Sequence, residues 1–193
     1  MLYFDDILAG LTNGHTPTNH DFSQGEVLFL TAENISDFTI EYGTDKRILH
    51  QHHQGELART ALRDGDVLLT IKGKVGNAAY VECPEKPVNI NQDVALLRFK
   101  SEYFSYYFIS YINSFLGKTF IEQLCTSQIN PFLSLGNIRQ IPVPIYETAV
   151  MKRIALRTEE SVSKGRQAAL DSNNLLNDAR KIIEGAILNC EKV

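Results

Sequence analysis

Apolar residues in the first part of the chain fall in short runs separated by polar turns. The runs that predict strands occupy residues 27–30, 67–71, 78–81 and 94–99. Short apolar runs bounded by turn residues are typical of strands in a packed sheet. The second and third runs flank a turn that contains Gly73 and Gly76, and they predict a hairpin because glycine readily supplies a positive φ.

The apolar period changes at residues 101–117, where large apolar residues recur every three or four positions. This spacing predicts a helix, with Ser101 as its N-cap and Gly117 as its C-terminal stop. Eight of the eighteen Phe and Tyr residues lie between Tyr103 and Phe120. An aromatic stripe at helical spacing is typical of a core helix, and the alternative is a platform on which nucleic-acid bases stack.

Residues 141–145, IPVPI, form a boundary because their two prolines remove backbone donors and favour extended geometry. After them the chain has no proline, and small or apolar residues recur in an approximate heptad pattern, which predicts a long helix over residues 147–193. The predicted seam consists of Ile154, Val162, Gly165, Ala169, Leu176, Ala179 and Ile183. Such a helix is only marginally stable by itself in water, so we expect a second helix to pair with it.

These patterns predict an α/β fold class: a mixed-sheet domain over residues 1–146, followed by a long C-terminal helix that forms a coiled-coil-like dimer arm. Residues 1–146 hold 11 Lys and Arg against 16 Asp and Glu, which gives no support to non-specific nucleic-acid binding. Residues 43–80 are the most basic stretch of this domain. Three widely spaced cysteines and no long apolar run predict a cytoplasmic protein without disulfides or membrane helices.

No catalytic motif emerges from the sequence. The stretch with Gly73 and Gly76 matches neither a phosphate-binding loop nor a dinucleotide fingerprint, so a strand turn is favoured, with Lys72 and Lys74 available to DNA phosphates. The run HQHH at residues 50–53 lacks the further ligands that a zinc site needs. Neither the carboxylate cluster of a nuclease nor the tetrad of an adenine methyltransferase is present. The sequence therefore favours a binding module without a cofactor.

Five stretches in order carry a family resemblance. They read GHTP at residues 14–17, GEVLFLTAENI at 25–35, GDVLLTIKGKVGNAAYV at 65–81, VNINQDVALLRFK at 88–100 and IPVPI at 141–145. This order closely resembles the specificity subunit of type I restriction–modification systems. The resemblance implies a DNA target recognition domain, here residues 1–146, and a long conserved helix that serves as spacer and docks a methyltransferase subunit. Family members usually carry two of each, so the chain corresponds to a half-size subunit or a fragment.

The resemblance implies a non-catalytic subunit that selects the DNA sequence. Its expected partners are double-stranded DNA, a methyltransferase subunit, a restriction subunit and a second copy in a homodimer. Base readers are expected outside the shared stretches, at residues 41–60 and 125–132. The candidates there are Arg47, His50, Gln51, His53, Gln54, Arg59, Ser127, Gln128 and Asn130. The alternatives are a small nuclease, a fragment of a methyltransferase–specificity fusion, and a decoy that only oligomerises.

Overall fold

The computed structural model describes residues 2–18, 21–82, 84, 86–101, 103–126, 129–144 and 147–190. The chain divides into two compact units, Met1–Leu156 and Arg157–Val193. The first unit extends past the expected boundary at residue 146, because the first turns of the long helix pack on the domain. None of the described helices is both long and apolar enough to span a membrane.

A four-stranded antiparallel sheet forms the centre of the first unit. Its strands, in spatial order, are β2 (Leu8–Asn13), β10 (Val94–Phe99), β7 (Val67–Thr70) and β8 (Ala78–Tyr80). Strands β7 and β8 form the predicted hairpin, with Val67 opposite Tyr80. Gly73 and Gly76 have φ values of 73° and 95° in the turn between them. The prediction that these glycines serve a strand turn is therefore confirmed.

A second, mixed sheet lies beside the first. It consists of β6 (Arg47–Ile48), β3 (Val27–Leu30) and β9 (Val88–Ile90), with β3 and β9 parallel. Two small sheets pair β1 (Leu2–Tyr3) with β11 (Pro142–Val143), and β4 (Ile35–Ser36) with β5 (Thr39–Ile40). The short helices are α1 (Phe4–Ile7), η1 (Ala32–Asn34), α2 (His50–Gln54), η2 (Ala58–Thr60) and α5 (Leu135–Arg139).

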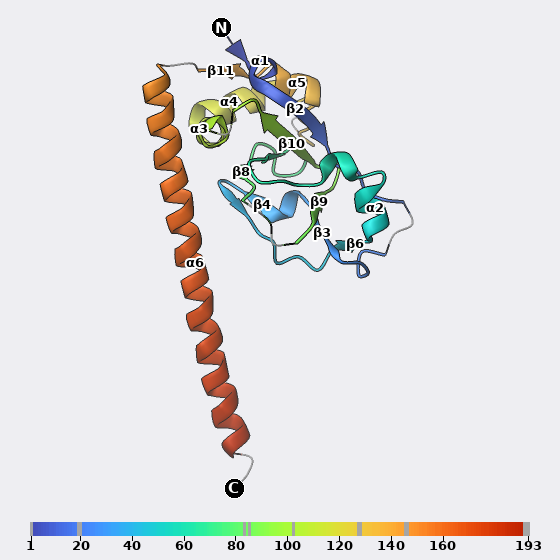
Figure 1. Cartoon of the computed structure of the whole chain (residues 1–193), viewed down its shortest axis with the longest axis vertical. Helices are drawn as coiled ribbons and strands as arrows, with labels where there is room; N and C mark the ends of the chain where they lie inside the picture. The colour runs from blue at the N-terminus through green and yellow to red at the C-terminus, as the bar shows by residue number, and fades with distance from the viewer. Residues whose placement is uncertain are drawn as a thin grey trace. The chain divides into compact units, whose positions relative to one another are not determined.

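The central strands of the four-stranded sheet, β7 and β10, are buried on both faces for most of their length. Helices α3 (Tyr103–Ile112) and α4 (Phe115–Leu124) lie on one side of β10, and β3 and β9 lie on the other (Figure 1). Val67 and Leu69 of β7 pack towards the helices, whereas Leu68 packs towards β3 and β9. This double burial explains why β7 reads as a continuous apolar run and not as an alternating one. The aromatic residues Tyr106, Tyr107, Phe108 and Tyr111 are buried, so the core interpretation of the aromatic stripe is confirmed.

The prediction of one helix ending at Gly117 is wrong. The chain breaks at Asn113, whose side chain accepts a hydrogen bond from the Ala78 backbone nitrogen at 3.0 Å and donates one to the Ala78 carbonyl at 2.8 Å. Ser114 then caps α4 by accepting from the Gly117 nitrogen at 3.3 Å. Gly117 lies inside α4, where a Cβ atom would come within 2.1 Å of the Tyr111 carbonyl oxygen. The glycine therefore permits close packing of α4 on the end of α3.

The predicted long helix is α6 (Thr148–Cys190), which runs for 43 residues (Figure 1). Met151 and Ala155 are buried in the first unit, and Ile154 is partly buried against the same core. Ile154 was expected to face water until a second helix covered it, but its own domain already covers part of it. Beyond Leu156 the helix carries exposed leucines at 170, 175 and 176. The seam positions Gly165, Ala169, Leu176 and Ala179 are exposed, and the Ile183 side chain lies outside the described set.

Candidate nucleic-acid interface

Several polar loops gather at one end of the four-stranded sheet. Strand β2 ends at Asn13, β7 ends at Thr70 and β10 begins at Val94, and their antiparallel pairing places these termini together. Asn13 donates from its side chain to the Gln92 carbonyl at 3.4 Å, which joins the loop after β2 to the loop before β10. We call this region the loop-end surface; it consists of Arg59, Thr126 and residues 13–16, 71–77, 91–93 and 129–132.

Lys72 connects the glycine turn to the segment that follows α4. Its ammonium nitrogen lies 4.0 Å from the Asp93 carboxylate and 5.3 Å from the centre of the Phe132 ring. The backbones of Lys72 and Phe132 form a β-bridge, and the Leu133 nitrogen donates to the Ile71 carbonyl at 3.1 Å. The structure thus brings the glycine turn beside the second candidate recognition segment.

Exposed polar side chains from both elements contribute to this part of the surface. Lys72, Lys74 and Asn130 are all exposed. The two other candidates from the same segment, Ser127 and Gln128, lie outside the described residues.

The first recognition segment reaches the loop-end surface through η2. Arg59 is exposed, and its guanidinium donates to the Asn13 carbonyl at 3.5 Å. A second link runs from His15 to Glu56, with 3.8 Å between the imidazole and the carboxylate. The run HQHH lies in the short helix α2, in which His50, Gln51 and Gln54 are exposed. Arg59, Lys72 and Asn130, far apart in the sequence, are therefore joined through a chain of contacts at one end of the sheet.

Arg47, another candidate base reader, does not belong to the loop-end surface. It belongs to β6, at the edge of the mixed sheet, opposite Leu28. Its guanidinium donates to the carbonyls of Thr44 and Lys46, the latter at 3.1 Å. These contacts hold the turn at residues 44–46, so Arg47 differs from Arg59 in what its side chain contacts.

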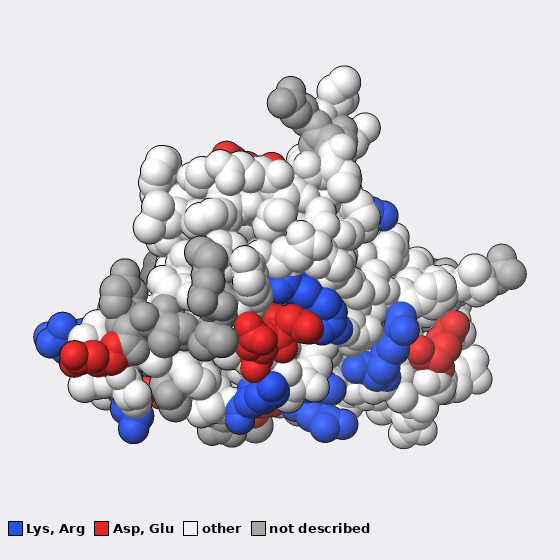
Figure 2. Space-filling view, turned by 90° about the horizontal axis from the view of Figure 1, so that it is seen from above, with Lys and Arg blue, Asp and Glu red and all other residues white. Residues whose placement is uncertain are grey.

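The basic side chains that Figure 2 shows are not gathered in one patch. Among the described residues on that face, Lys and Arg lie in small groups next to Asp and Glu. Ion pairs elsewhere in the domain follow the same pattern, such as Lys118 with Asp37 at 2.6 Å and Arg98 with Asp66 at 2.8 Å. This face therefore does not support a binding mode based on a broad positive field, and DNA contact there would depend on a few local side chains (Figure 2).

His53 faces inward from α2. Its Nδ1 atom lies 3.1 Å from the side-chain nitrogen of Asn89, which has only hydrogens to offer, so the imidazole accepts this hydrogen bond in its neutral form. Burial, with a further contribution from His50, lowers the pKa of His53 below 6.5. No group of three or more His, Cys, Asp or Glu suited to a metal ion occurs among the residues that the structure describes.

Sequence reasoning missed the polar residues that support this surface. Asn89 is fully buried and binds Thr60, Leu57 and His53, and Gln92 bonds to the loop after β2. One signal was available in the sequence. Asn89 stands between Val88 and Ile90 in an apolar strand, and an amide at a buried strand position needs hydrogen-bond partners.

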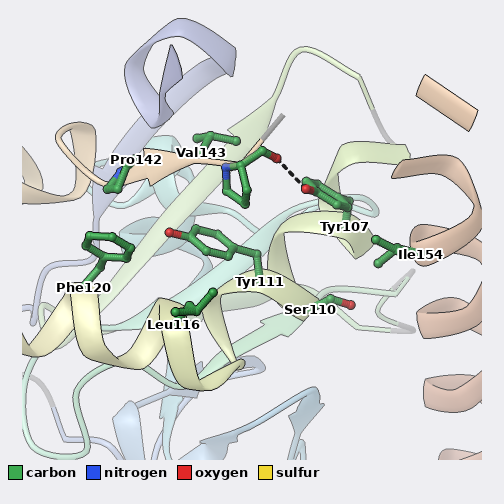
Figure 3. Close-up of a pocket in the computed structure, with 9 residues that line it drawn as sticks. Tyr107, Ser110, Tyr111, Leu116, Phe120, Pro142, Val143 and Ile154 are labelled. Atoms are coloured by element: carbon green, nitrogen blue, oxygen red, sulfur yellow. Dashed lines mark hydrogen bonds between the residues drawn. The ribbon is translucent and has the colours of Figure 1, made fainter. Parts of the chain in front are cut away.

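An apolar pocket of about 340 Å³ lies apart from these loops, between α3, α4, β11 and the first turns of α6 (Figure 3). Its lining consists of Tyr107, Ser110, Tyr111, Leu116, Phe120, Pro142, Val143, Pro144 and Ile154. The Tyr107 hydroxyl donates to the Pro144 carbonyl at 2.5 Å. Burial, with a smaller contribution from Tyr107, raises the pKa of Tyr111 to about 12. With no cation among the described residues of its lining, the pocket suits an apolar group and not a phosphate.

Comparison with known proteins identifies the fold. No family model and no curated protein matches the chain. Among solved structures, the S subunit of a type I restriction–modification system from M. genitalium matches with a TM-score of 0.57 at 13% identity, over 88% of this chain and 40% of that one. The HsdS subunit from Thermoanaerobacter tengcongensis matches with a TM-score of 0.55 at 15% identity, over 86% and 39%. The type IIG restriction endonuclease BpuSI matches with a TM-score of 0.62 at 10% identity, over 82% and 26%.

These matches define the class of fold. The chain has the mixed α/β domain and long helix found in type I specificity subunits, and it spans about 40% of the length of the two S subunits. The expected α/β fold class, a mixed-sheet domain followed by a long helix, is confirmed.

Proposed function

We propose that the chain is a non-catalytic specificity subunit that selects a DNA sequence for partner methyltransferase and restriction subunits. The observation that carries this proposal is the loop-end surface, where exposed Arg59, Lys72, Lys74 and Asn130 lie on a fold shared with type I specificity subunits. Loops held by a rigid sheet are the usual place for binding residues.

The side chains divide by what they can recognise. Arg59 carries the fork of donors that reads guanine in a major groove, and the exposed amides Gln51, Gln54 and Asn130 can pair with base edges. Lys72 and Lys74 offer point charges suited to phosphate oxygens, which carry no sequence information directly. We therefore assign sequence choice to α2, η2 and residues 126–132, and backbone contact to the glycine turn.

The second part of the proposal is a homodimer built on α6. At 43 residues the helix is about 64 Å long, and its leucines at 170, 175 and 176 are exposed. Leu176 belongs to the predicted seam, and burying such a side chain contributes roughly 1.5–3 kcal/mol, which a second copy would supply. In an antiparallel pair the start of one helix lies beside the end of the other.

Charges of both signs lie along α6, and one antiparallel register brings several opposite charges together. Lys152 and Arg157 lie near its start with Glu159 and Glu160, and Asp178 and Glu184 lie near its end with Arg180 and Lys181. A register that sets Lys152 opposite Glu184 also brings Arg157 within one residue of the position opposite Asp178. The helices then cross near Gly165 and Ala169, where small side chains allow close approach.

Such a dimer carries two identical recognition domains related by a two-fold axis. Identical domains in this relation read inverted copies of one half-site, so the target is a split palindrome with an unread spacer. The test is to co-express the chain with its cognate methyltransferase and to sequence the methylated sites. A split palindrome supports the proposal, whereas two unrelated half-sites or methylation without site preference would overturn it.

One specific observation favours a second candidate function. The fold match to the type IIG endonuclease BpuSI has the higher TM-score, at 0.62, although the chain covers 26% of that protein. Under this alternative the chain supplies DNA recognition to catalytic domains of the same polypeptide and needs no second copy. A chain that selects one continuous DNA site as a monomer would support this alternative over the homodimer.

A further inference from the structure

Asn89 lies beneath the first recognition segment and is fully buried in the centre of β9. A primary amide can donate two hydrogen bonds and accept two. The Asn89 oxygen accepts from the Thr60 hydroxyl at 2.6 Å and from the Ile90 nitrogen at 2.9 Å. Its nitrogen donates to the Leu57 carbonyl at 3.0 Å and to His53 Nδ1 at 3.1 Å. All four hydrogen-bonding positions of this side chain are therefore occupied.

Three of these four bonds tie residues 53–60 to the sheet. They hold His53, Leu57 and Thr60, which are spaced along α2 and η2. The Leu57 side chain is itself fully buried in a cluster with Val27, Phe29 and Ile48. The backbone that carries exposed Gln54 and Arg59 is thus fixed at points on both sides of each residue.

We propose that Asn89 is a positioning residue for DNA sequence recognition, which sets the orientation of Gln54 and Arg59 only while His53 is neutral. This inference rests on the proposed function and assigns a role that the exposed residues alone do not reveal. Base reading by an arginine fork depends on its direction, so a displaced α2–η2 segment loses sequence choice before it loses attraction to phosphates.

The dependence on His53 follows from the direction of its hydrogen bond. A protonated imidazole carries hydrogen on both nitrogens, so Nδ1 can no longer accept from Asn89. Among the described residues, His50 on the same helix is the ionisable neighbour that contributes to the lowered pKa of His53. His50 lies with its ring centre 6.4 Å away, whereas Glu56 binds His52 at 2.7 Å and lies 3.8 Å from His15. No carboxylate among the described contacts of His53 compensates its protonation.

The experiment uses the chain co-expressed with its cognate methyltransferase and a duplex DNA library with a randomised target region. Site selection is measured at pH 7.5 and at pH 5.5 for four chains: wild type, Thr60→Val, Asn89→Ala and His53→Gln. Asn113→Ala is the matched control. It also removes a side-chain amide that makes two hydrogen bonds, here with the Ala78 backbone, and Asn113 makes neither of them with α2 or η2. Hydrogen exchange of residues 50–60 reports the order of the segment without DNA.

For the wild type we expect sharp selection at pH 7.5 and weaker selection at pH 5.5. Thr60→Val and Asn89→Ala should lower selectivity at pH 7.5 by roughly tenfold, as expected when a buried partner is left unsatisfied, with faster exchange at residues 50–60. His53→Gln offers an acceptor that does not titrate, so its selectivity should be retained at both pH values. Asn113→Ala should select as the wild type does.

A different experimental result would contradict each part of the inference. If the wild type selects no sequence, the proposed function fails. If it selects a sequence but Thr60→Val and Asn89→Ala select the same one equally well, the positioning role is wrong. Should Asn89→Ala fail to fold, Thr60→Val decides this point, because it removes only the contacts of one hydroxyl, to Asn89 and to the Leu57 carbonyl, and preserves side-chain volume. A His53→Gln chain whose selectivity still falls at pH 5.5 would overturn the dependence on neutral His53.

Discussion

Lys72 lies with its ammonium nitrogen 5.3 Å from the centre of the Phe132 ring. This contact joins the turn between β7 and β8 to the segment that follows α4, and Asp93 of the loop before β10 lies 4.0 Å from the same nitrogen. Three segments distant in the sequence therefore meet at one cation. A lysine in this place suits the proposed contact with a DNA phosphate next to the segment that carries Asn130.

Removing the two exposed lysines of the glycine turn should weaken DNA binding without changing the site. Lys72→Ala with Lys74→Ala is expected to lower affinity evenly across sequences and to reduce the slope of log affinity against log salt by about one for each phosphate that is no longer neutralised. Lys46→Ala serves as the control, because Lys46 pairs with Glu33 and does not belong to the residues that make up the loop-end surface. Fluorescence anisotropy at several salt concentrations measures both quantities. A changed target sequence in the double variant would contradict the assignment to phosphate.

Arg59 and Arg47 were both predicted from the sequence as base readers, and they should now behave differently. Arg59→Ala is expected to reduce discrimination at one base pair by about 1–3 kcal/mol, the usual contribution of a bidentate arginine. Arg47→Ala removes the donors that hold the carbonyls of Thr44 and Lys46 and should mainly loosen that turn. Sequencing of selected sites distinguishes the two effects. Unchanged site choice in Arg59→Ala, with altered choice in Arg47→Ala, would reverse the assignment.

Gly117→Ala should destabilise the first unit. The added Cβ would lie 2.1 Å from the Tyr111 carbonyl oxygen, so α4 must move away from α3, and such overpacking typically costs about 1–3 kcal/mol. Gly136→Ala is the matched control, because a Cβ there meets its nearest neighbour, the Ser134 hydroxyl, at an ordinary 3.7 Å. Thermal unfolding followed by circular dichroism compares the two. Equal stability of the two variants would show that α3 and α4 adapt to the extra methyl group.

A charge in the apolar stripe of α6 should separate the proposed dimer. Leu176→Asp with Ile183→Asp is expected to give a monomer with a folded first unit, because each change places a carboxylate where a second helix would pack. Asn174→Asp adds the same charge about 200° around the helix from Leu176 and should leave the dimer intact. Sedimentation velocity at micromolar concentration measures the outcome. A monomeric wild type would refute the homodimer.

Stability should fall as the pH is lowered through the range where His53 titrates. The pKa of His53 in the folded chain lies below 6.5, so the unfolded chain takes up a proton first as the pH drops. The contribution of neutral His53 is therefore complete above the unfolded pKa of about 6.5 and is lost between that value and the lower folded pKa. Urea unfolding of the wild type and of His53→Gln at several pH values isolates this contribution. The hypothesis fails if the difference between the two is independent of pH.

The sequence by itself determined the elements whose signals are local. Apolar runs predicted β3, β7, β8 and β10, since a strand buried on both faces must be apolar along its length. The positive φ of Gly73 and Gly76 followed from the turn that the flanking runs require. The heptad pattern after the prolines predicted α6, because helical periodicity needs no partner to be visible. The aromatic stripe was also correctly assigned to the core.

Only the tertiary structure decided how these elements meet. The break at Asn113 depends on a hydrogen-bonded pair with Ala78, and the distinction between Arg59 and Arg47 depends on which carbonyls lie within reach. The place of Lys72 beside Phe132 and the four bonds of Asn89 likewise join residues from different elements. Periodicity along a chain reports which face of an element is buried, but not against which other segment. The amides and cations of the candidate site acquire their roles only from that pairing.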